Sequence, residues 1–330
     1  MTSYLRTDLC DVLGLEVPII QAGMSVHTSA ALVVAVSEAG ALGSLGAWGR
    51  PADALATGIQ QIREGTDRPF AVNFLPPDLD EGAFAATLSA GVPVISFATG
   101  DPGELVERAH DAGSLVTNQV TTVEHAEQAA ELGVNVIIAQ GGEAGGYGGE
   151  IASTVLVPQV VQRVEPVPVV AAGGFIDGAG LVAALALGAC GISVGTRFLA
   201  TVESPIHPDY QKRILTAEAR DAVKSPRFNL LAPNPGSTGY GTAVRVLRSA
   251  FVDQVADVED AEDVSRLLDE LVSAAREGTG HELVAAAGQS AGRVGHVEPA
   301  AAVVHQIVAE AQAVLARLAP FIAPAAQRKS

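Results

Sequence analysis

The stretch VVAAGGFIDGAGLVAALALGACGISVGT (169–196) contains one complete structural unit of this 330-residue chain. A short run of small and β-branched residues, Val169–Ala172, ends at two glycines. An apolar helical segment follows, and a second short run, Gly191–Val194, ends again at a glycine. Two parallel strands need a long crossover between them, which is usually a helix. The stretch therefore predicts parallel strands with helices packed on their face.

The same unit recurs from Pro18 to Val194. Eight such units predict a closed (β/α)8 TIM barrel. An open doubly wound sheet is the alternative, but the barrel is favoured because open sheets of that type usually have fewer strands. The predicted strands are Pro18–Gln21, Ala41–Leu45, Phe70–Phe74, Val94–Phe97, Leu115–Gln119, Val136–Gln140, Val169–Ala172 and Gly191–Val194.

The repeat stops after the eighth strand, which predicts two domains. Residues 1–200 are expected to form the barrel, completed by the C-terminal segment 281–330 with a last amphipathic helix over Val297–Leu318. Residues 201–280, called the lid below, are rich in proline and turn residues between polar helices. We expect the lid to be a smaller, mainly helical appended domain.

Composition limits the partners. The formal net charge is −17 and only three lysines occur, so a nucleic acid or an anionic membrane surface is not expected to bind. The two cysteines form no C-x-x-C motif, and the N-terminus lacks a signal-peptide pattern. We therefore expect a cytoplasmic protein that acts on a small molecule, and the sequence leaves its oligomeric state open.

Glycines gather just after the last two predicted strands. Gly173 and Gly174 follow one of them, and Gly195 and Thr196 follow the other. In phosphate-binding barrels these two loops present backbone N–H groups to an anion, and glycine lets the backbone approach it closely. The dinucleotide pattern at Gly178, which continues through Gly180 to Ala183, falls within a predicted helix. The sequence thus favours a mononucleotide phosphate.

The densest glycine cluster is QGGEAGGYGG (140–149), directly after the sixth predicted strand. So many glycines exclude a helix interior and predict a loop that can lie against a flat ligand. Its chemically able side chains are Gln140, Glu143 and Tyr147, although Glu143 would serve equally well as an anchor for the loop.

Seven stretches together resemble the FMN-dependent nitronate monooxygenases, formerly called 2-nitropropane dioxygenases. The related FMN-dependent enoyl-acyl carrier protein reductases have similar motifs. The stretches run in order from Pro18 to Val294: PIIQAGMS, EAGALGSLG, VNFLPP, AQGGEAGGYGG, VVAAGGFIDG, ALALGACGISVGTRFLATVES and AAAGQSAGRV.

The resemblance implies a barrel that holds FMN with its phosphate at the last two strand ends. Gly23 and Met24 would lie along the isoalloxazine ring, and Gln289 and Ser290 would approach from the C-terminal segment. The remaining implied FMN contacts are Asn73, Gln140, Gly145, Gly173, Gly174, Ser193, Val194, Gly195 and Thr196.

The chain departs from this family at Tyr147, where both groups usually have histidine in an E-A-G-G-H pattern. For the monooxygenases, the resemblance implies that this histidine acts as a general base toward neutral nitroalkanes. Tyrosine has an ordinary pKa of about 10 against about 6.5 for histidine, so it is mostly a hydrogen-bond donor at neutral pH. Tyr147 therefore fits an anionic nitronate better than a neutral nitroalkane. His27, after the first strand, would be the substitute base, or else a helix-cap or surface residue.

Three function classes remain open. The first is a flavin oxidase or monooxygenase that passes electrons to O2, and we favour it. The second is an NAD(P)H-dependent ene reductase, for which a basic lid patch of Lys212, Arg213 and Arg220 would have to attract an acidic carrier protein. The third is a flavin-binding homologue whose chemistry changed with Tyr147. No short-spaced histidine motif occurs, so no metal is expected.

Overall fold

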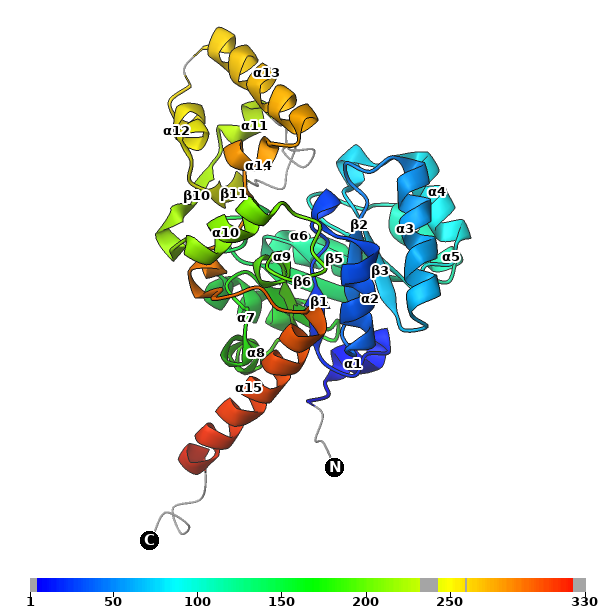
Figure 1. Cartoon of the computed structure of the whole chain (residues 1–330). Helices are drawn as coiled ribbons and strands as arrows, with labels where there is room; N and C mark the ends of the chain where they lie inside the picture. The colour runs from blue at the N-terminus through cyan, green and yellow to red at the C-terminus, as the bar shows by residue number, and fades with distance from the viewer. Residues whose placement is uncertain (1–4, 232–242, 259, 323–330) are drawn as a thin grey trace.

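A computed structural model describes residues 5–231, 243–258 and 260–322 of the chain, with a parallel barrel at its centre (Figure 1). Eight strands pair in parallel in the order β1-β9-β8-β6-β5-β4-β3-β2, and a further parallel bridge joins Ile20 to Leu42 across the two ends of this order. The predicted (β/α)8 barrel is confirmed. Its strands are β1 (Ile19–Gln21), β2 (Gly43–Gly46), β3 (Phe70–Phe74), β4 (Val94–Phe97), β5 (Leu115–Val120), β6 (Val136–Gln140), β8 (Val169–Ala172) and β9 (Gly191–Val194).

The side chain of Gln21 supports the closure between β1 and β2. Its Oε1 accepts a hydrogen bond from the backbone N–H of Ser44 at 2.9 Å, and its Nε2 donates to the Ser44 carbonyl at 3.1 Å. A buried amide thus pairs with the backbone groups of the neighbouring strand where the regular ladder is shortest.

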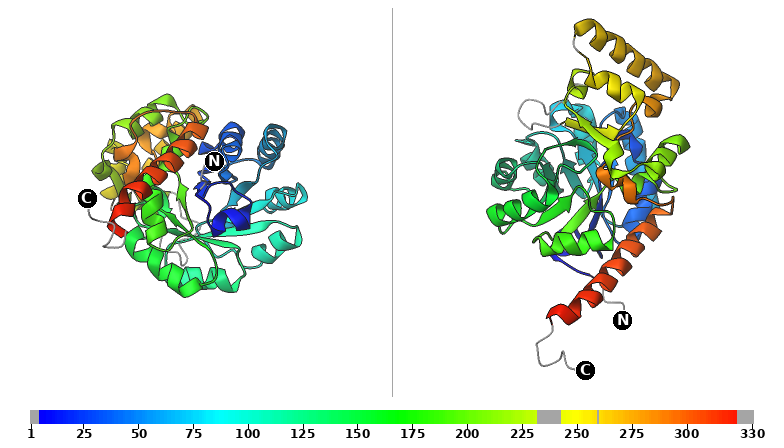
Figure 2. Two further views of the ribbon diagram at one scale, coloured as in Figure 1. Left: turned by 90° about the horizontal axis from the view of Figure 1, so that it is seen from below. Right: turned by 90° about the vertical axis from the view of Figure 1, so that its left-hand side faces the viewer.

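Helices surround the strands, as the view from below shows (Figure 2). The strands are buried on both faces, which explains why they read as short continuous apolar runs and not as alternating ones. Side chains at Ser29, Asp80, Thr122 and Asp177 cap four of the helices by accepting a backbone N–H. The helices are α2 (Ala30–Glu38), α3 (Ala52–Gly65), α4 (Glu81–Ser89), α5 (Leu105–Asp111), α6 (Val123–Glu131), α7 (Ser153–Val164) and α8 (Gly178–Ala186).

A short N-terminal helix, α1 (Asp8–Leu13), closes the lower end of the barrel. Its Leu9, Cys10 and Leu13 are buried in one cluster with the inward-facing residues Ile20 and Val170. The bottom of the barrel is therefore filled with apolar side chains, and a ligand can enter only at the opposite end, where the strands terminate.

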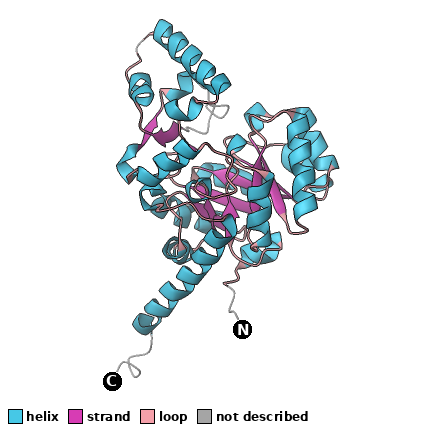
Figure 3. Cartoon of the chain, in the orientation of Figure 1, coloured by secondary structure: helices cyan, strands magenta, loops and turns pink. Residues whose placement is uncertain are grey.

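The lid contains strands as well as helices (Figure 3). β10 (Ala222–Ser225) pairs antiparallel with β11 (Ala243–Leu247), and β11 pairs in turn with β7 (Gly146–Gly148). β7 lies inside the glycine cluster that was predicted to be only a loop. Such a pairing is not visible in local sequence, because its two strands are far apart in the chain. The helices are α10 (Pro208–Thr216), α11 (Phe228–Leu231), α12 (Ala250–Ala256), α13 (Ala261–Glu277) and α14 (Gly280–Leu283).

The last helix, α15 (Ala300–Ile322), packs against α8 and α2 and then extends beyond the barrel (Figure 1). A side chain at Gly178 would lie 2.1 Å from the backbone nitrogen of Ala311. The glycine at the start of α8 thus permits close helix packing, which accounts for the first glycine of the dinucleotide-like pattern. No helix in the described part of the chain is both long and apolar enough to span a membrane.

Candidate active site

A layer of small polar side chains lies inside the barrel just below its open end. Strand alternation directs one set of residues outward to the helices and the other set inward. Among the inward set, Ser44, Asn73, Ser96, Thr117, Gln119 and Ser193 line a narrow cavity of about 10 Å³. A cavity of this size holds at most one water molecule. A flat organic ligand must therefore lie across the mouth and not within the barrel.

Asn73 and Gly23 meet at this mouth. The Asn73 Nδ2 donates to the Ser96 hydroxyl at 3.1 Å, which fixes the amide. A side chain at Gly23 would lie 2.4 Å from the Asn73 Cβ, so only glycine lets the backbone after β1 pass so close. Met24 follows, with its sulfur 3.6 Å from the position that a Gly195 Cβ would occupy. The structure thus gathers Gly23, Met24, Asn73 and Gly195 on one side of the mouth.

Gln140 carries an acceptor without a partner. It ends β6, is almost fully buried, and its Oε1 has no hydrogen-bond partner in the part of the chain that the structure describes. A buried acceptor left in this state costs free energy. The amide lies beneath Gly148, whose missing side chain would come 3.2 Å from the same Oε1. Gln140 is therefore suited to receive an N–H group from a ligand at the mouth.

Glycines with left-handed backbone follow β8. Gly173 has φ +92° and Gly174 has φ +84°. A side chain at Gly173 would lie 2.9 Å from the carbonyl oxygen of Gly141, whereas the nearest atom to one at Gly174 is 3.8 Å away. The first glycine packs against the β6 loop, and the second leaves space beside it.

A short helix follows β9, directly beside that space. α9 (Thr196–Leu199) begins after Gly195, and β8 and β9 are paired neighbours. Backbone N–H groups at a helix start attract anions. The two glycine turns thus form one cradle, defined here as Gly173, Gly174, Gly195 and Thr196. Ser193 faces the barrel interior, whereas Val194 is buried in the outer core and offers the mouth only its backbone.

The C-terminal segment returns to the mouth between these loops. The N–H of Gly288 donates to the Thr196 hydroxyl at 2.9 Å, and the N–H of Gln289 donates to the Glu143 carbonyl at 3.0 Å. Gly145 must be glycine here, because its Cβ would come within 2.5 Å of the backbone of Ala287. Gln289 begins the turn η4 (Gln289–Arg293), in which Ser290 is buried. The structure therefore joins three predicted segments at one place.

The Glu143 carboxylate anchors the glycine loop. It accepts the Ser153 hydroxyl at 2.8 Å and the Ser153 backbone N–H at 3.0 Å. Both bonds hold it at the start of α7, where a negative charge is favourable. Of the two roles expected for Glu143, the contacts match the anchor.

Tyr147 lies on β7, opposite Val244 of the lid strand β11. Its ring is half-buried, and burial together with the Asp78 carboxylate raises the pKa of its hydroxyl above the ordinary value. The group thus stays protonated at neutral pH and can donate a hydrogen bond. Asp78 belongs to the turn η2 (Pro76–Asp78) after β3 and accepts a hydrogen bond from the Trp48 indole. Trp48 and Asp78 were not among the predicted site residues.

Two basic lid residues hold the glycine loop from the other side. Arg245 donates to the Gly142 carbonyl from Nε at 3.2 Å and from Nη2 at 2.7 Å. The Lys224 ammonium donates to the Gly149 carbonyl and lies 3.4 Å from the Glu150 carboxylate. Burial lowers the pKa of both groups. This clamp, defined as Arg245 and Lys224, could not be predicted from local sequence, because it depends on the pairing of β7 with β11.

His27 lies elsewhere, in the turn η1 (Ser25–His27) after β1. Its ring meets the edge of Tyr210 on α10 with centroids 5.6 Å apart and planes at 89°. Burial, with a smaller contribution from the Arg50 charge, lowers the pKa of the imidazole, so it is neutral at neutral pH. His27 is thus packed against the lid on a different element from Tyr147.

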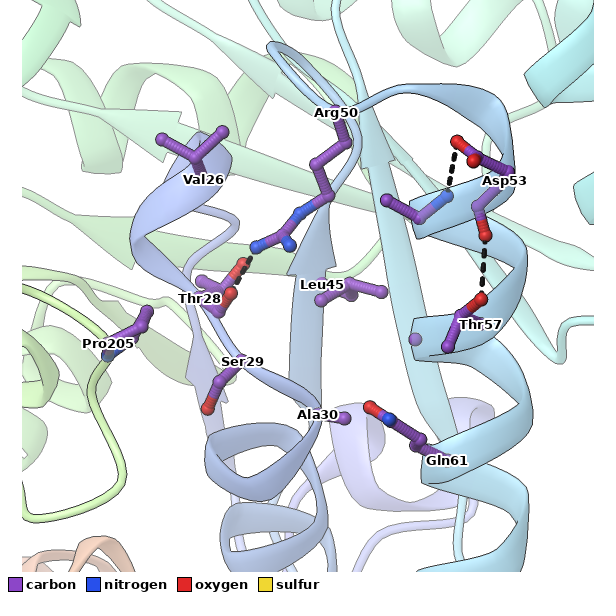
Figure 4. Close-up of a pocket in the computed structure, with 12 residues that line it drawn as sticks. Val26, Thr28, Ser29, Ala30, Leu45, Arg50, Asp53, Thr57, Gln61 and Pro205 are labelled. Atoms are coloured by element: carbon purple, nitrogen blue, oxygen red, sulfur yellow. Dashed lines mark hydrogen bonds between the residues drawn. The ribbon is translucent and has the colours of Figure 1, made fainter. Parts of the chain in front are cut away.

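A larger cavity, of about 350 Å³, lies outside the barrel between α2 and α3 (Figure 4). Arg50 reaches into it and donates from Nε to the Gly46 carbonyl at 2.7 Å and from Nη2 to the Thr28 carbonyl. Asp53, Thr57 and Gln61 lie on the facing side of α3. None of the predicted site residues lines this cavity. The candidate active site is therefore the barrel mouth.

The chain matches a known protein family. The model for the family described as nitronate monooxygenase matches residues 6–90 and 80–310. A probable nitronate monooxygenase of Staphylococcus saprophyticus is 32% identical over 304 residues, which cover 78% of this chain and 82% of that protein. A (3aS,4S,5R,7aS)-5-hydroxy-7a-methyl-1-oxo-octahydro-1H-indene-4-carboxyl-CoA dehydrogenase of Mycobacterium tuberculosis is 37% identical over 254 residues, or 76% of this chain and 68% of that one.

Solved structures show the same likeness over nearly the whole chain. FabK from Thermotoga maritima superposes with a TM-score of 0.86 at 33% identity, covering 96% of this chain and 99% of that chain. A nitroalkane oxidase from Streptomyces ansochromogenes superposes with a TM-score of 0.78 at 29% identity, covering 93% and 99%. The similarity thus includes monooxygenase, oxidase and dehydrogenase relatives.

Proposed function

Because the chain belongs to the nitronate monooxygenase family, we propose that it is an FMN-dependent oxidoreductase that oxidises a small nitronate, or a related anion, with O2. Membership of this family makes the chain an oxidoreductase. FMN, the nitronate and O2 are the parts that we propose. The observation that carries the choice of an anionic substrate is Tyr147 on β7 in the glycine loop, where a half-buried phenol can donate a hydrogen bond but does not act as a base at neutral pH.

The residues at the mouth fit a flavin mononucleotide. The cradle formed by Gly173, Gly174, Gly195 and Thr196 offers space and backbone N–H groups to one phosphate. The Oε1 of Gln140, which has no partner among the described residues, suits a ring N–H, and the close approach of Gly23 to Asn73 leaves backbone for the ring to lie against. When bound, FMN supplies an electron acceptor for the substrate and a donor for O2.

Tyr147 would orient the substrate by donating a hydrogen bond to a nitronate oxygen. A nitronate is already deprotonated at carbon, so its oxidation needs no general base at this position. A hydrogen bond to a negative oxygen is stronger than one to a neutral group, because the acceptor is charged. Asp78 supports this role since its carboxylate favours the neutral phenol over the phenolate.

An NAD(P)H-dependent ene reductase is the second candidate, and the likeness to FabK favours it. The basic lid patch predicted for an acidic carrier protein does not support it. Arg213 donates to the backbone carbonyls of His281, Glu282, Leu247 and Arg248, and Arg220 pairs with Glu218 at 2.9 Å. Two of the three cations are thus engaged within the lid. A flavin-binding homologue with altered chemistry is the third.

Anaerobic stopped-flow mixing separates the three. The purified flavoprotein is mixed with propyl-2-nitronate in one arm and with NADPH in the other, and O2 is then admitted. We expect loss of the flavin's visible absorbance with the nitronate and its recovery with O2. Fast reduction by NADPH alone would establish the reductase, and no reduction in either arm would establish the third class. Heat-released cofactor should run as FMN on chromatography, and FAD or no flavin would contradict the cofactor assignment.

A further inference from the structure

Three side chains able to bind a metal ion meet where the lid returns to the C-terminal segment. His207 precedes α10, Asp209 lies in the first turn of that helix, and His281 belongs to α14. One ligand atom of each lies within 4.8 Å of those of the other two. No local motif marks this group, because His281 comes from a distant part of the chain.

Local contacts fix the first two residues relative to each other. The His207 Nδ1 accepts the backbone N–H of Asp209 at 3.2 Å and lies 3.5 Å from the Asp209 carboxylate. A carboxylate beside an imidazole is the common arrangement at metal sites, where it either binds the ion or orients the ring. His207 and Asp209 are both exposed, so water can complete the coordination of an ion there.

His281 supplies the independent observation. Its ring stacks on that of His207 with centroids 4.3 Å apart and planes at 23°. Its Nε2 is shielded from solvent, and no residue described in the structure forms a hydrogen bond with it. Arg213 holds the segment in place through the carbonyl oxygens of His281 and Glu282, the latter at 3.1 Å. A buried imidazole nitrogen without a partner is an unsatisfied polar group that an ion would satisfy.

We propose that His207, Asp209 and His281 form a binding site for one divalent first-row transition ion of the Zn²⁺ type. Two imidazole nitrogens and one carboxylate oxygen are the ligands that zinc, cobalt and nickel accept. Ca²⁺ and Mg²⁺ prefer oxygen ligands throughout. The chain as a whole is acidic, with a formal net charge of −17, and the Asp209 carboxylate supplies the negative charge at the cluster itself. Because the two rings are stacked, their in-plane nitrogen lone pairs do not converge, so the exposed His207 ring must rotate out of the stack when the ion binds.

The ion would brace the lid against the C-terminal segment. α14 leads within a few residues to Gly288 and Gln289, whose N–H groups bind Thr196 and Glu143 at the mouth. α10 carries Tyr210, which packs against His27 and donates to the Ala286 carbonyl at 2.6 Å. A bond from α10 through the ion to α14 would thus stiffen two neighbouring approaches to the mouth. The role is structural, and no catalytic step passes through the ion.

Cobalt titration of the flavin-loaded protein, prepared without an affinity tag and stripped with a chelator, tests the site. The difference absorption of bound Co²⁺ should saturate at one equivalent per chain and disappear when Zn²⁺ is added. Excess Zn²⁺ should also raise the thermal unfolding midpoint, because a ligand that binds only the folded state stabilises it. Mg²⁺ should do neither.

The variants His207→Gln and Asp209→Asn change exposed side chains, so the protein should fold, and each should weaken Co²⁺ binding at least tenfold. His305→Gln removes an exposed histidine of α15 and serves as the matched control, with binding unchanged. The proposal is overturned if Co²⁺ does not bind, or if it binds equally well to the two site variants and the wild type.

Discussion

The two sides of the barrel mouth are built in different ways. On one side, the cradle of Gly173, Gly174, Gly195 and Thr196 follows two adjacent barrel strands, and its shape comes from backbone geometry. On the other side, Tyr147 stands on a strand that pairs with the lid, and Arg245 holds the loop before it. The cradle is thus a property of the barrel, whereas the substrate side depends on distant contacts. The first side would hold the proposed FMN, and the second would decide which substrate reaches it.

The largest effect is expected on the cradle side, at Gly174. An alanine there must adopt φ near +84° and would place a Cβ in the space assigned to the phosphate. Left-handed backbone costs an L-residue about 1–2 kcal/mol, and displacing the anion adds to it. We expect Gly174→Ala to weaken FMN retention by about 10- to 100-fold, measured as flavin released on dilution.

Gly133→Ala is the matched control for the backbone term. Gly133 has φ +80°, no atom lies within 4 Å of its would-be Cβ, and it precedes β6 at the closed end of the barrel. The Gly133→Ala variant should lose about as much stability as Gly174→Ala and should keep its flavin. Equal flavin loss in both variants would mean that Gly174 only relieves backbone strain.

On the substrate side, Arg245→Met should disturb the loop that carries Tyr147. The change removes two charged hydrogen bonds to the Gly142 carbonyl, worth about 1.5–3 kcal/mol when a buried partner is left unpaired. We expect kcat/KM for the nitronate to fall about tenfold, with less flavin loss than in Gly174→Ala.

Arg248→Met is the control for Arg245, because it removes a cation from the same part of the lid. Arg248 is exposed and pairs with the Asp253 carboxylate at 2.8 Å. Exposed ion pairs contribute about 0–1 kcal/mol. Similar kinetics in the two variants would show that the loop does not depend on the Arg245 clamp.

The smallest effect is expected on the pH dependence of stability, through His27. Because burial lowers its pKa in the folded chain, the unfolded chain takes up a proton at a higher pH than the folded one. Stability should therefore be full above the ordinary pKa of about 6.5 and fall as the pH drops below it. In urea unfolding, His27→Gln should lose part of this acid dependence, while His305→Gln, in exposed α15, should keep it. Identical slopes in both variants would contradict the role of burial at His27.

The barrel and its cradle could be predicted from the sequence. Each barrel strand is a short apolar run between glycines or prolines, so all eight appeared within about two residues of their observed positions. The cradle glycines could be predicted as a phosphate site because they come directly after the last two barrel strands. These features are local, and the barrel topology brings them together without further information.

The substrate side was less accessible to sequence reasoning. β7, β10 and β11 form one sheet from segments far apart, so the glycine cluster was predicted as a loop and this small sheet was not predicted. Trp48 and Asp78 carry no motif, and their link to Tyr147 appears only in three dimensions. The pairing of His207 with His281 was invisible for the same reason.

The preference of the wild type for nitronate over neutral nitroalkane tests the central claim most directly. The measurement is kcat/KM with propyl-2-nitronate and with 2-nitropropane for the wild type, Tyr147→Phe, Tyr147→His and His27→Ala. We predict a strong nitronate preference, a loss of about 1–3 kcal/mol in nitronate turnover for Tyr147→Phe, and a gain on neutral nitroalkane only in Tyr147→His. His27→Ala should change little. Fast wild-type turnover of neutral nitroalkane that survives Tyr147→Phe and disappears in His27→Ala would contradict the account and make His27 the base.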